Sequence, residues 1–229
     1  MLESYTKQGL LLYICVHSQM TKLDISHGAM YCSRSNVSIH VEQTKQSFEY
    51  SRNRYPQAIS NAVNVRALRA SFADLTKNTR LKYRDLVDAV QNTASEEAIL
   101  QNANVALMLD LPALELPKLF GAAMKLGFAT GIDTKAAIQA LSIGVGRQSR
   151  MVLDNIGIMF KAEDAYKKFP DLDRVTAWKQ YALQLINQKA DLLPQPDTKK
   201  VEKLQREAQV HDMHTTLGEK LLVTQTCSK

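Results

Sequence analysis

Cysteine is scarce in this sequence, and its three cysteines are far apart, odd in number and without a CxxC pair or a histidine at metal-ligand spacing. They are Cys15, Cys32 and Cys227. This pattern does not indicate a disulfide framework or a cysteine-based zinc site. It favours a protein of a reducing compartment.

Long hydrophobic runs are also missing. The best candidate for a targeting segment, Leu10–Val16 after Lys7, has the length of a short secretory apolar core, but no small-residue cleavage site follows it. It is far shorter than the ~20 apolar residues that a helix needs to cross a bilayer, and no other stretch comes closer. The sequence therefore predicts no membrane span and does not favour a signal peptide.

A strong charge of one sign is lacking as well. The 229 residues include 29 Lys and Arg against 23 Asp and Glu, which gives a net charge of +6, and the excess is spread along the chain. A solvated surface explains it as well as a phosphate-binding track does, so nucleic-acid binding stays an alternative. With 45% apolar and 23% charged residues, the composition is that of a chain that folds and buries a core.

The chain changes character near Tyr55-Pro56. Before this point no helical period lasts more than two turns, and Ser33–Val41 (SRSNVSIHV) is a candidate short strand. After it, apolar residues recur at helical spacing. We therefore predict an all-α fold, a multi-helix bundle with short loops. Residues 1–56 form an N-terminal extension, for which the sequence allows either a short strand or disorder. The predicted helical domain covers 57–193, and a C-terminal amphipathic helix covers 197–223.

Helical spacing predicts two helices directly after this point. The first apolar face comprises Val63, Leu68, Phe72 and Leu75. The second helix is expected to be capped by Thr79 and to bury an apolar set of Leu81, Val87 and Val90. Both helices need partners to cover these faces.

A third helix is marked by Thr93-Ala94-Ser95-Glu96, which has the form of a capping box. In such a box the Thr93 hydroxyl accepts from the N–H of Glu96, while the Glu96 carboxylate reaches back. This helix should end before Pro112, because proline lacks a backbone donor and disfavours helix in the residue before it.

The next boundaries are also local. Pro117 suits the first turn of a helix, and Gly131 can take the left-handed conformation at its end. Asp133 can then cap a helix that runs from Thr134 to about Ser142.

Three further helices are predicted downstream. One covers Ala162–Phe169 and stops before Pro170, and Asp171 or Asp173 caps the next. The apolar face of that second helix comprises Val175, Trp178, Tyr181, Ala182, Leu185 and Ile186.

The last helix follows the rigid break Pro194-Gln195-Pro196 and begins at Asp197. Its apolar side comprises Val201, Leu204, Ala208, Leu217 and Leu221. Its other side is rich in Lys and Glu, which favours a solvated face over a binding site.

Gly144-Val145-Gly146, in the connection Leu141–Ile158, invites comparison with a phosphate-binding loop. A dinucleotide fingerprint needs a preceding strand and a third glycine, and a P-loop needs Gly-Lys-Ser/Thr; neither is present. The residues before the glycines have a helical pattern. We therefore predict a glycine C-cap followed by a tight turn.

Charged residues flank this predicted turn. Arg147 and Arg150 beside Ser149 can hold a phosphate or carboxylate of a partner, or they can bond helix carbonyls and pair with Asp154. Asp154 and Asn155 next to Gly157 are typical of a turn. The candidate structural or interaction residues are Gly144, Gly146, Arg147, Ser149, Arg150, Asp154, Asn155 and Gly157.

His211 and His214 are the remaining candidates for chemistry, because residues three apart on a helix can bring two imidazoles to one metal. No third ligand at matching spacing is evident, so ordinary surface histidines are favoured. Trp178 is expected to be a core or interface anchor. Since no stretch assembles a nucleophile, a base and an orienting group, we predict a protein that is not an enzyme and that has no catalytic residue, cofactor or metal.

Several stretches carry a resemblance to a known family when they are taken together. The most specific is LSIGVGRQSRMVLDNIGI (Leu141–Ile158), followed by KAEDAYKKF (Lys161–Phe169) and preceded by NANVAL (Asn102–Leu107) and GID (Gly131–Asp133). LRASFADLTKNTRLKYRDLVDAV lies upstream, and TAWKQYALQLINQKADLL and KVEKLQREAQVHDMHTTLGEKLLV lie downstream. Over roughly residues 65–223, the sequence resembles a bacteriophage or prophage tail tape measure protein.

The resemblance implies a largely helical structural protein of the virion tail, assembled in the bacterial cytoplasm, that acts in tail assembly and sets tail length. It implies tail-tube proteins and a tail assembly chaperone as partners, with self-association also open, and tape measure proteins share no common catalytic site. Even as one helix at ~1.5 Å per residue, the chain would be shorter than many tails. We expect one globular helical segment of such a protein, be it a fragment, a degraded prophage gene or a small relative. The alternative is a basic helical module that binds nucleic acid or another protein.

Overall fold

The structure is a computed structural model that describes residues 56–226, all within one contact unit that spans Tyr50–Lys229. All regular structure in this described range is helical, which confirms the predicted all-α class. The candidate strand Ser33–Val41, nearly all of the predicted extension over 1–56, and the cysteines Cys15, Cys32 and Cys227 lie outside the described residues.

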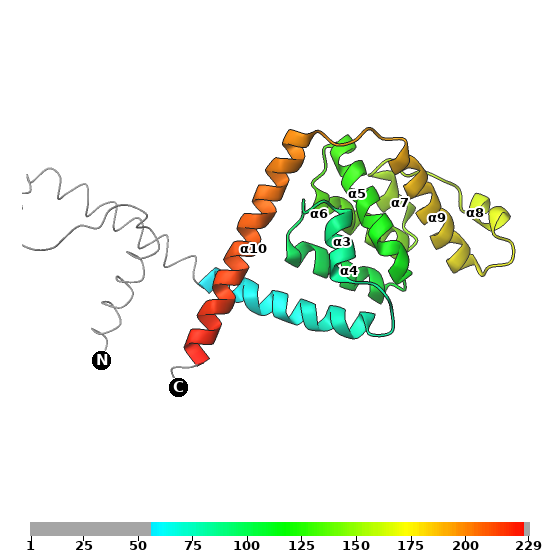
Figure 1. Cartoon of the computed structure of the whole chain (residues 1–229). Helices are drawn as coiled ribbons and strands as arrows, with labels where there is room; N and C mark the ends of the chain where they lie inside the picture. The colour runs from blue at the N-terminus through cyan, green and yellow to red at the C-terminus, as the bar shows by residue number, and fades with distance from the viewer. Residues whose placement is uncertain (1–55, 227–229) are drawn as a thin grey trace, which may run out of the picture. The chain divides into compact units, whose positions relative to one another are not determined.

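The described helices follow one another with short connections (Figure 1). Residues 56–76 form the first. The labelled elements are α3 (Tyr83–Ala89), α4 (Glu96–Met108), the short 3₁₀ helix η1 (Ala113–Glu115), α5 (Leu116–Thr130), α6 (Thr134–Gly146), α7 (Arg150–Asp154), α8 (Ala162–Lys168), α9 (Arg174–Asp191) and α10 (Thr198–Thr226).

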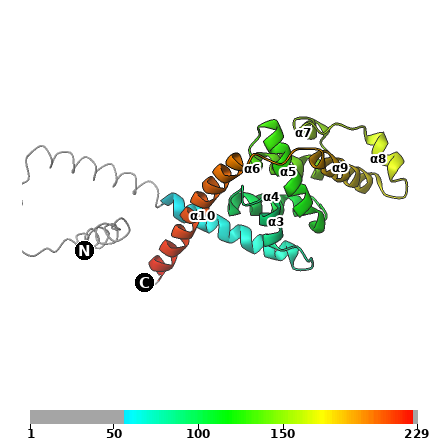
Figure 2. The same cartoon turned by 45° about the horizontal axis from the view of Figure 1, so that its top comes forward.

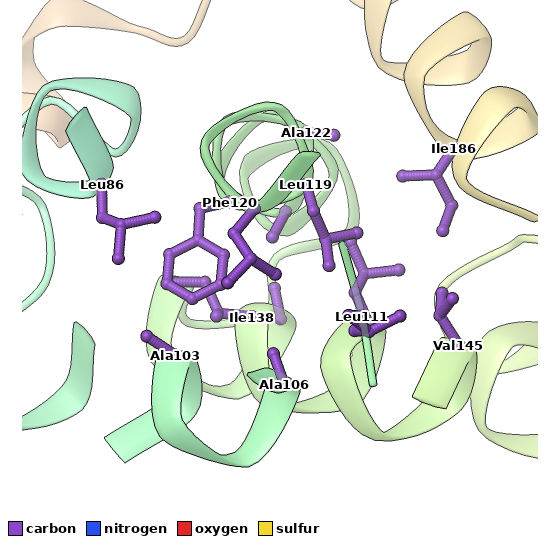
Figure 3. Close-up of a cluster of buried hydrophobic side chains, with 14 of the residues drawn as sticks. Leu86, Ala103, Ala106, Leu111, Leu119, Phe120, Ala122, Ile138, Val145 and Ile186 are labelled. Carbon is purple, nitrogen blue, oxygen red and sulfur yellow. The ribbon is translucent and has the colours of Figure 1, made fainter. Parts of the chain in front are cut away.

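Helix α5 is the centre of the hydrophobic core, since it packs against α3, α6 and α9, and α4 packs against α6. Figure 3 shows Leu119 and Phe120 of α5 directed toward α4 and α6, where they meet Ala103 and Ile138. Phe120, Ala103 and Ile138 are completely buried. Large side chains on α5 facing alanines on α4 allow close packing of the two helices.

The local boundary signals around α5, α6 and α9 are confirmed. Pro117 is in the first turn of α5, and Gly131 ends that helix with φ +75°. Asp133 caps α6 by accepting from the N–H of Lys135 at 3.0 Å. Asp173, one of the two predicted candidates, caps α9 by accepting from the N–H of Thr176, also at 3.0 Å.

The predicted cap at Thr79 is wrong. Its hydroxyl donates to the carbonyl of Thr76 at 3.0 Å, and α3 begins only at Tyr83. The start of α3 is stabilised instead by the Asp85 carboxylate, which accepts from the N–H of Lys82 at 2.9 Å.

The capping box at Thr93 is also wrong. The Thr93 hydroxyl is buried and donates to the carbonyl of Val90 at 2.7 Å, so it ends the preceding segment. The residue before α4 is Ser95, whose hydroxyl oxygen accepts from the N–H of Ala98 at 3.4 Å. The helix therefore exists where it was predicted, but it starts at Glu96, two residues later than a cap at Thr93 would place it.

Some apolar faces differ from the predicted ones. Val63 and Leu75 are exposed in the helix over 56–76, as are Val175 in α9 and Leu217 in α10. The buried face of the first helix comprises Ala58, Ala62, Val65 and Phe72. Phe72 is thus buried as predicted, but Ala58, Ala62 and Val65 complete the covered side in place of Val63 and Leu75.

Helix α10 crosses the helix over residues 56–76, as both views show (Figures 1 and 2). At the crossing, a Cβ atom on Gly218 would overlap the carbonyl of Ala58 and lie 3.0 Å from the Cβ of Ala62. Only glycine fits at this approach of the two backbones. Among residues 198–223 of α10, the buried ones are Val201, Ala208, Thr215 and Gly218.

None of the helices in the described range combines the length and the apolar character that a membrane span requires. The finding is consistent with the prediction of no membrane span for these residues.

Candidate functional site

The two glycines of the predicted turn lie inside a helix. Helix α6 continues to Gly146 rather than ending near Ser142, and neither Gly144 nor Gly146 has a positive φ. A Cβ on Gly144 would lie 2.6 Å from Cδ2 of Leu153, and a Cβ on Gly146 would lie 2.6 Å from Cδ1 of Leu109. The glycines are needed for the close approach of α7 and of the end of α4, and not for a turn.

The chain leaves α6 through a left-handed residue that is not glycine. Gln148 has φ +55°. The N–H of Ser149 donates to the carbonyl of Gly144 at 2.8 Å, and the N–H of Gln148 donates to that of Val145 at 3.2 Å. This pair of bonds is a Schellman motif, so the helix end predicted in this region exists, displaced to Gln148.

Helix α7 ends with the same motif. The N–H of Ile158 donates to the carbonyl of Leu153 at 3.0 Å, and the N–H of Gly157 donates to that of Asp154 at 2.9 Å. Gly157 takes φ +76°, which few residues other than glycine adopt readily. Gly157 is therefore the turn glycine of this connection, and backbone bonds hold the turn that the sequence assigned to Asp154 and Asn155.

Two charged residues of the connection, Arg150 and Asp154, lie at an open surface hollow of about 880 Å³ between α7 and α8. Arg150 and Lys161 are basic, and Asp154 and Asp164 are acidic. The hollow is lined by Ser149, Arg150, Met151, Asp154, Met159, Phe160, Lys161 and Asp164. Three predicted site residues, Ser149, Arg150 and Asp154, are thus brought together.

Asp154 forms no ion pair with Arg147 or Arg150 among the residues from 56 to 226, although the sequence made it their nearest candidate. All three side chains are exposed, and so is Asn155. Arg147 and Asn155 are not part of the lining. The hollow therefore presents separate charges of both signs beside two exposed methionines, Met151 and Met159, which suits contact with another protein.

A second polar cluster joins α10 to the rest of the fold. We call it the α10 clasp, and it comprises Arg69, Glu96, Glu97, His211, Asp212 and Glu219. Arg69 binds both carboxylate oxygens of Glu96, through Nε at 2.6 Å and Nη2 at 2.7 Å, and its Nη1 binds Glu219 at 2.6 Å. One guanidinium therefore links three helices, and the two carboxylates raise the pKa of Arg69.

Asp212 connects α10 to the start of α4 by a hydrogen bond. Its Oδ1 accepts from the N–H of Glu96 at 3.0 Å, a backbone donor that α4 itself cannot satisfy. Burial raises the pKa of the Asp212 carboxyl, opposed by this hydrogen bond. Beside it, His211 Nε2 lies 3.3 Å from Glu97, while its buried Nδ1 is 3.7 Å from Asp212 and makes no hydrogen bond. Burial also raises the pKa of Tyr83 nearby.

The metal hypothesis for His211 and His214 gains no support within residues 56–226, where no group of three His, Cys, Asp or Glu side chains could hold an ion. His211 lies instead against the carboxylate of Glu97. Trp178 is buried as expected, with its ring 5.0 Å from that of Phe160.

Sequence reasoning missed the α10 clasp and the helix crossing. Gly218 was the available signal, since an isolated glycine inside a helical pattern often marks a close approach of another backbone. Arg69, Asp212 and Glu219 gave no such signal, because their partners are up to 150 residues away along the chain.

No protein-family model matches the chain, and comparison with curated proteins and with solved structures finds no match.

Proposed function

We propose that the chain is a structural protein of the phage-tail type, a helical packing module that acts in tail assembly and tail-length determination. The observation that carries the proposal is the combination of stretches over residues 65–223 that resembles tape measure proteins, above all Leu141–Ile158. In the structure these stretches belong to one continuous helical module, and the most specific one forms two consecutive Schellman turns.

The proposed contact with tail proteins uses the hollow beside α7. Its lining offers Arg150 and Lys161 for carboxylates, Asp154 and Asp164 for basic groups, and the exposed Met151 and Met159 for apolar contact. Such a mixed surface fits a protein partner with both charges better than a polyanion, which the two aspartates repel. The proposed partners are a tail-tube protein and a tail assembly chaperone, and the proposed location is the virion tail.

The test is a deletion of the gene in a strain whose prophage can be induced, followed by electron microscopy and mass spectrometry of the particles. We expect particles without normal tails, recovery of tails with a plasmid copy, and the chain itself in purified wild-type tails. Tails of unchanged length in the deletion strain would overturn the proposal.

A matched pair of variants tests the hollow. Arg150→Glu should lower co-purification with the tail-tube protein or the chaperone, whereas Arg84→Glu, at an exposed arginine of α3, should not. Equal loss with both variants would remove the hollow from the proposal.

The second candidate is a basic helical module that binds nucleic acid, which the exposed Arg147 and Arg150 favour. Phosphate contacts make such binding fall steeply with salt. Retention on a DNA column at low salt, with loss in Arg147→Ala, would support this candidate and count against the tail proposal. Co-purification with tail proteins and no retention on DNA would exclude it.

A further inference from the structure

Helix α10 has a second apolar face that the described residues of the fold leave exposed. Val210, Met213 and Leu217 are 53%, 68% and 44% exposed, and their spacing of three and four residues puts them in one stripe. At 100° per residue this stripe lies on the side opposite to Val201, Ala208 and Thr215, which are buried. We call the stripe the outer face of α10.

The charges of α10 are divided between its two sides. Asp212 and Glu219 are turned inward, where they bind the N–H of Glu96 and the guanidinium of Arg69. Two of the four carboxylates of α10 are therefore bound on its inner side.

Basic residues predominate among the charges beside the outer face. Glu207 lies 3.8 Å from Lys203, which leaves that pair nearly neutral. Arg206, whose Nε donates to the carbonyl of Glu202, lies one turn before the stripe, and Lys220 follows it. On this side of α10 four basic residues, Lys199, Lys203, Arg206 and Lys220, outnumber the two carboxylates Glu202 and Glu207, so the surroundings of the apolar stripe are basic on balance.

We propose that the outer face of α10 docks an acidic amphipathic helix of a partner protein. The spacing of Val210, Met213 and Leu217 is that of the anchors by which one helix packs along another. With 29 residues, α10 is about 43 Å long and offers room for a partner helix on this side. Acidic residues that flank the apolar stripe of the partner would meet Arg206 and Lys220.

The same charges disfavour the other occupants. Two copies of α10 would bring Arg206 and Lys220 of one copy against basic residues of the other, in both the parallel and the antiparallel orientation. Nucleic acid would contact the basic residues but would leave Val210, Met213 and Leu217 in water. The inference does not depend on a role in a phage tail, so the two proposals can fail separately.

The experiment measures binding of the full chain to two synthetic fluorescent peptides by anisotropy. Both peptides are about three heptads long with Leu at positions a and d, one with Glu at the flanking positions and one with Lys in their place. We expect the Glu peptide to bind at least about tenfold more tightly than the Lys peptide, and its affinity to fall as salt is added.

Variants locate the site. Met213→Ser should weaken binding of the Glu peptide about tenfold, because the central apolar anchor is lost. Met108→Ser is the matched control, since Met108 is 62% exposed at the end of α4 and lies outside the hollow beside α7. The double variant Arg206→Glu with Lys220→Glu should reverse the preference toward the Lys peptide. Circular dichroism of each variant verifies the fold.

Equal binding of both peptides, or equal loss in Met213→Ser and Met108→Ser, would overturn the proposal. So would tighter binding to a DNA duplex than to the Glu peptide. A dimer in sedimentation that Met213→Ser dissociates would assign the outer face to a second copy of the chain instead.

Discussion

The core around α5 and the attachment of α10 are built on different physical principles. Phe120, Ile138 and their neighbours are large or tightly packed apolar residues that exclude water completely. α10 is held by a few small buried residues, a glycine crossing at Gly218 and the ion pairs of the α10 clasp. Hydrophobic burial is insensitive to pH and salt, whereas partly exposed ion pairs respond to both. The comparison predicts a stable core and a last helix that can be loosened separately.

The largest effect is expected in the core. Phe120→Ala should lower the free energy of unfolding by about 3–5 kcal/mol, because it removes a buried ring and leaves a cavity. Urea denaturation followed by circular dichroism measures the loss. Phe160→Ala, at a partly buried ring against Trp178, is the control and should lose less. Similar losses in the two variants would contradict the central place of α5.

Gly218→Val should destabilise the attachment of α10 and leave the stability of the core around α5 unchanged. Its side chain would overlap the backbone of Ala58, so the expected cost is about 1–3 kcal/mol, confined to the contact of α10 with the helix over residues 56–76. Hydrogen exchange should show faster exchange in α10 with unchanged protection in α5. Gln209→Val, at an exposed position of α10, controls for the effect of valine on the helix. Equal loss of protection in α5 would mean that α10 and the core unfold together.

Arg69→Met tests the ion pairs of the α10 clasp. Because the Arg69 side chain is nearly half exposed, the loss of its bonds to Glu96 and Glu219 should cost less than about 1 kcal/mol. The difference from wild type in urea denaturation should shrink as salt is added. Arg84→Met removes a more exposed pair with Asp88 and should have no measurable effect. A loss that is independent of salt would show that Arg69 acts through packing instead.

The smallest effect concerns Asp212 and pH. Its folded-state pKa is raised, so the folded state binds the proton more tightly, and this contribution to stability is present below the ordinary pKa of aspartate and lost as pH rises through the raised value. Asp212→Asn keeps an acceptor for the N–H of Glu96 without the charge. It should be near neutral in stability at pH 7 and should flatten this part of the pH dependence.

Urea denaturation of both proteins between about pH 4 and pH 7 measures the difference. The other titratable groups near Asp212 are Glu96, His211 and Tyr83, and they are unchanged in the variant. Parallel pH profiles would show that Asp212 does not contribute to the slope.

The local helix boundaries were within reach of the sequence. Gly131, Asp133 and Asp173 act where the sequence placed them, because a cap or a left-handed C-terminal residue forms its bonds within a few positions along the chain. The all-α class followed for the same reason. The helical period of the apolar residues is a local property.

The start of α4 depends on a distant residue as well as on local ones. The sequence assigned its cap to Thr93 alone, but in the structure Ser95 precedes the helix, and Asp212 of α10 accepts from the N–H of Glu96 that the predicted box gave to Thr93. Asp212 lies 116 residues from Glu96 along the chain. No short window of sequence contains that partner.

The sequence by itself determined the helical class of residues 56–226 and many of the helix ends. Only the tertiary structure decided what the glycines do. Gly144 and Gly146 became contact points for Leu153 and Leu109, and Gly218 became the crossing of two helices. The physical reason is that a glycine in a helix and a glycine in a turn have the same side chain, and only the neighbour that approaches it distinguishes them. The same holds for the two faces of α10, because only the packing of the described residues decides that Val201, Ala208 and Thr215 are buried while Val210, Met213 and Leu217 are exposed.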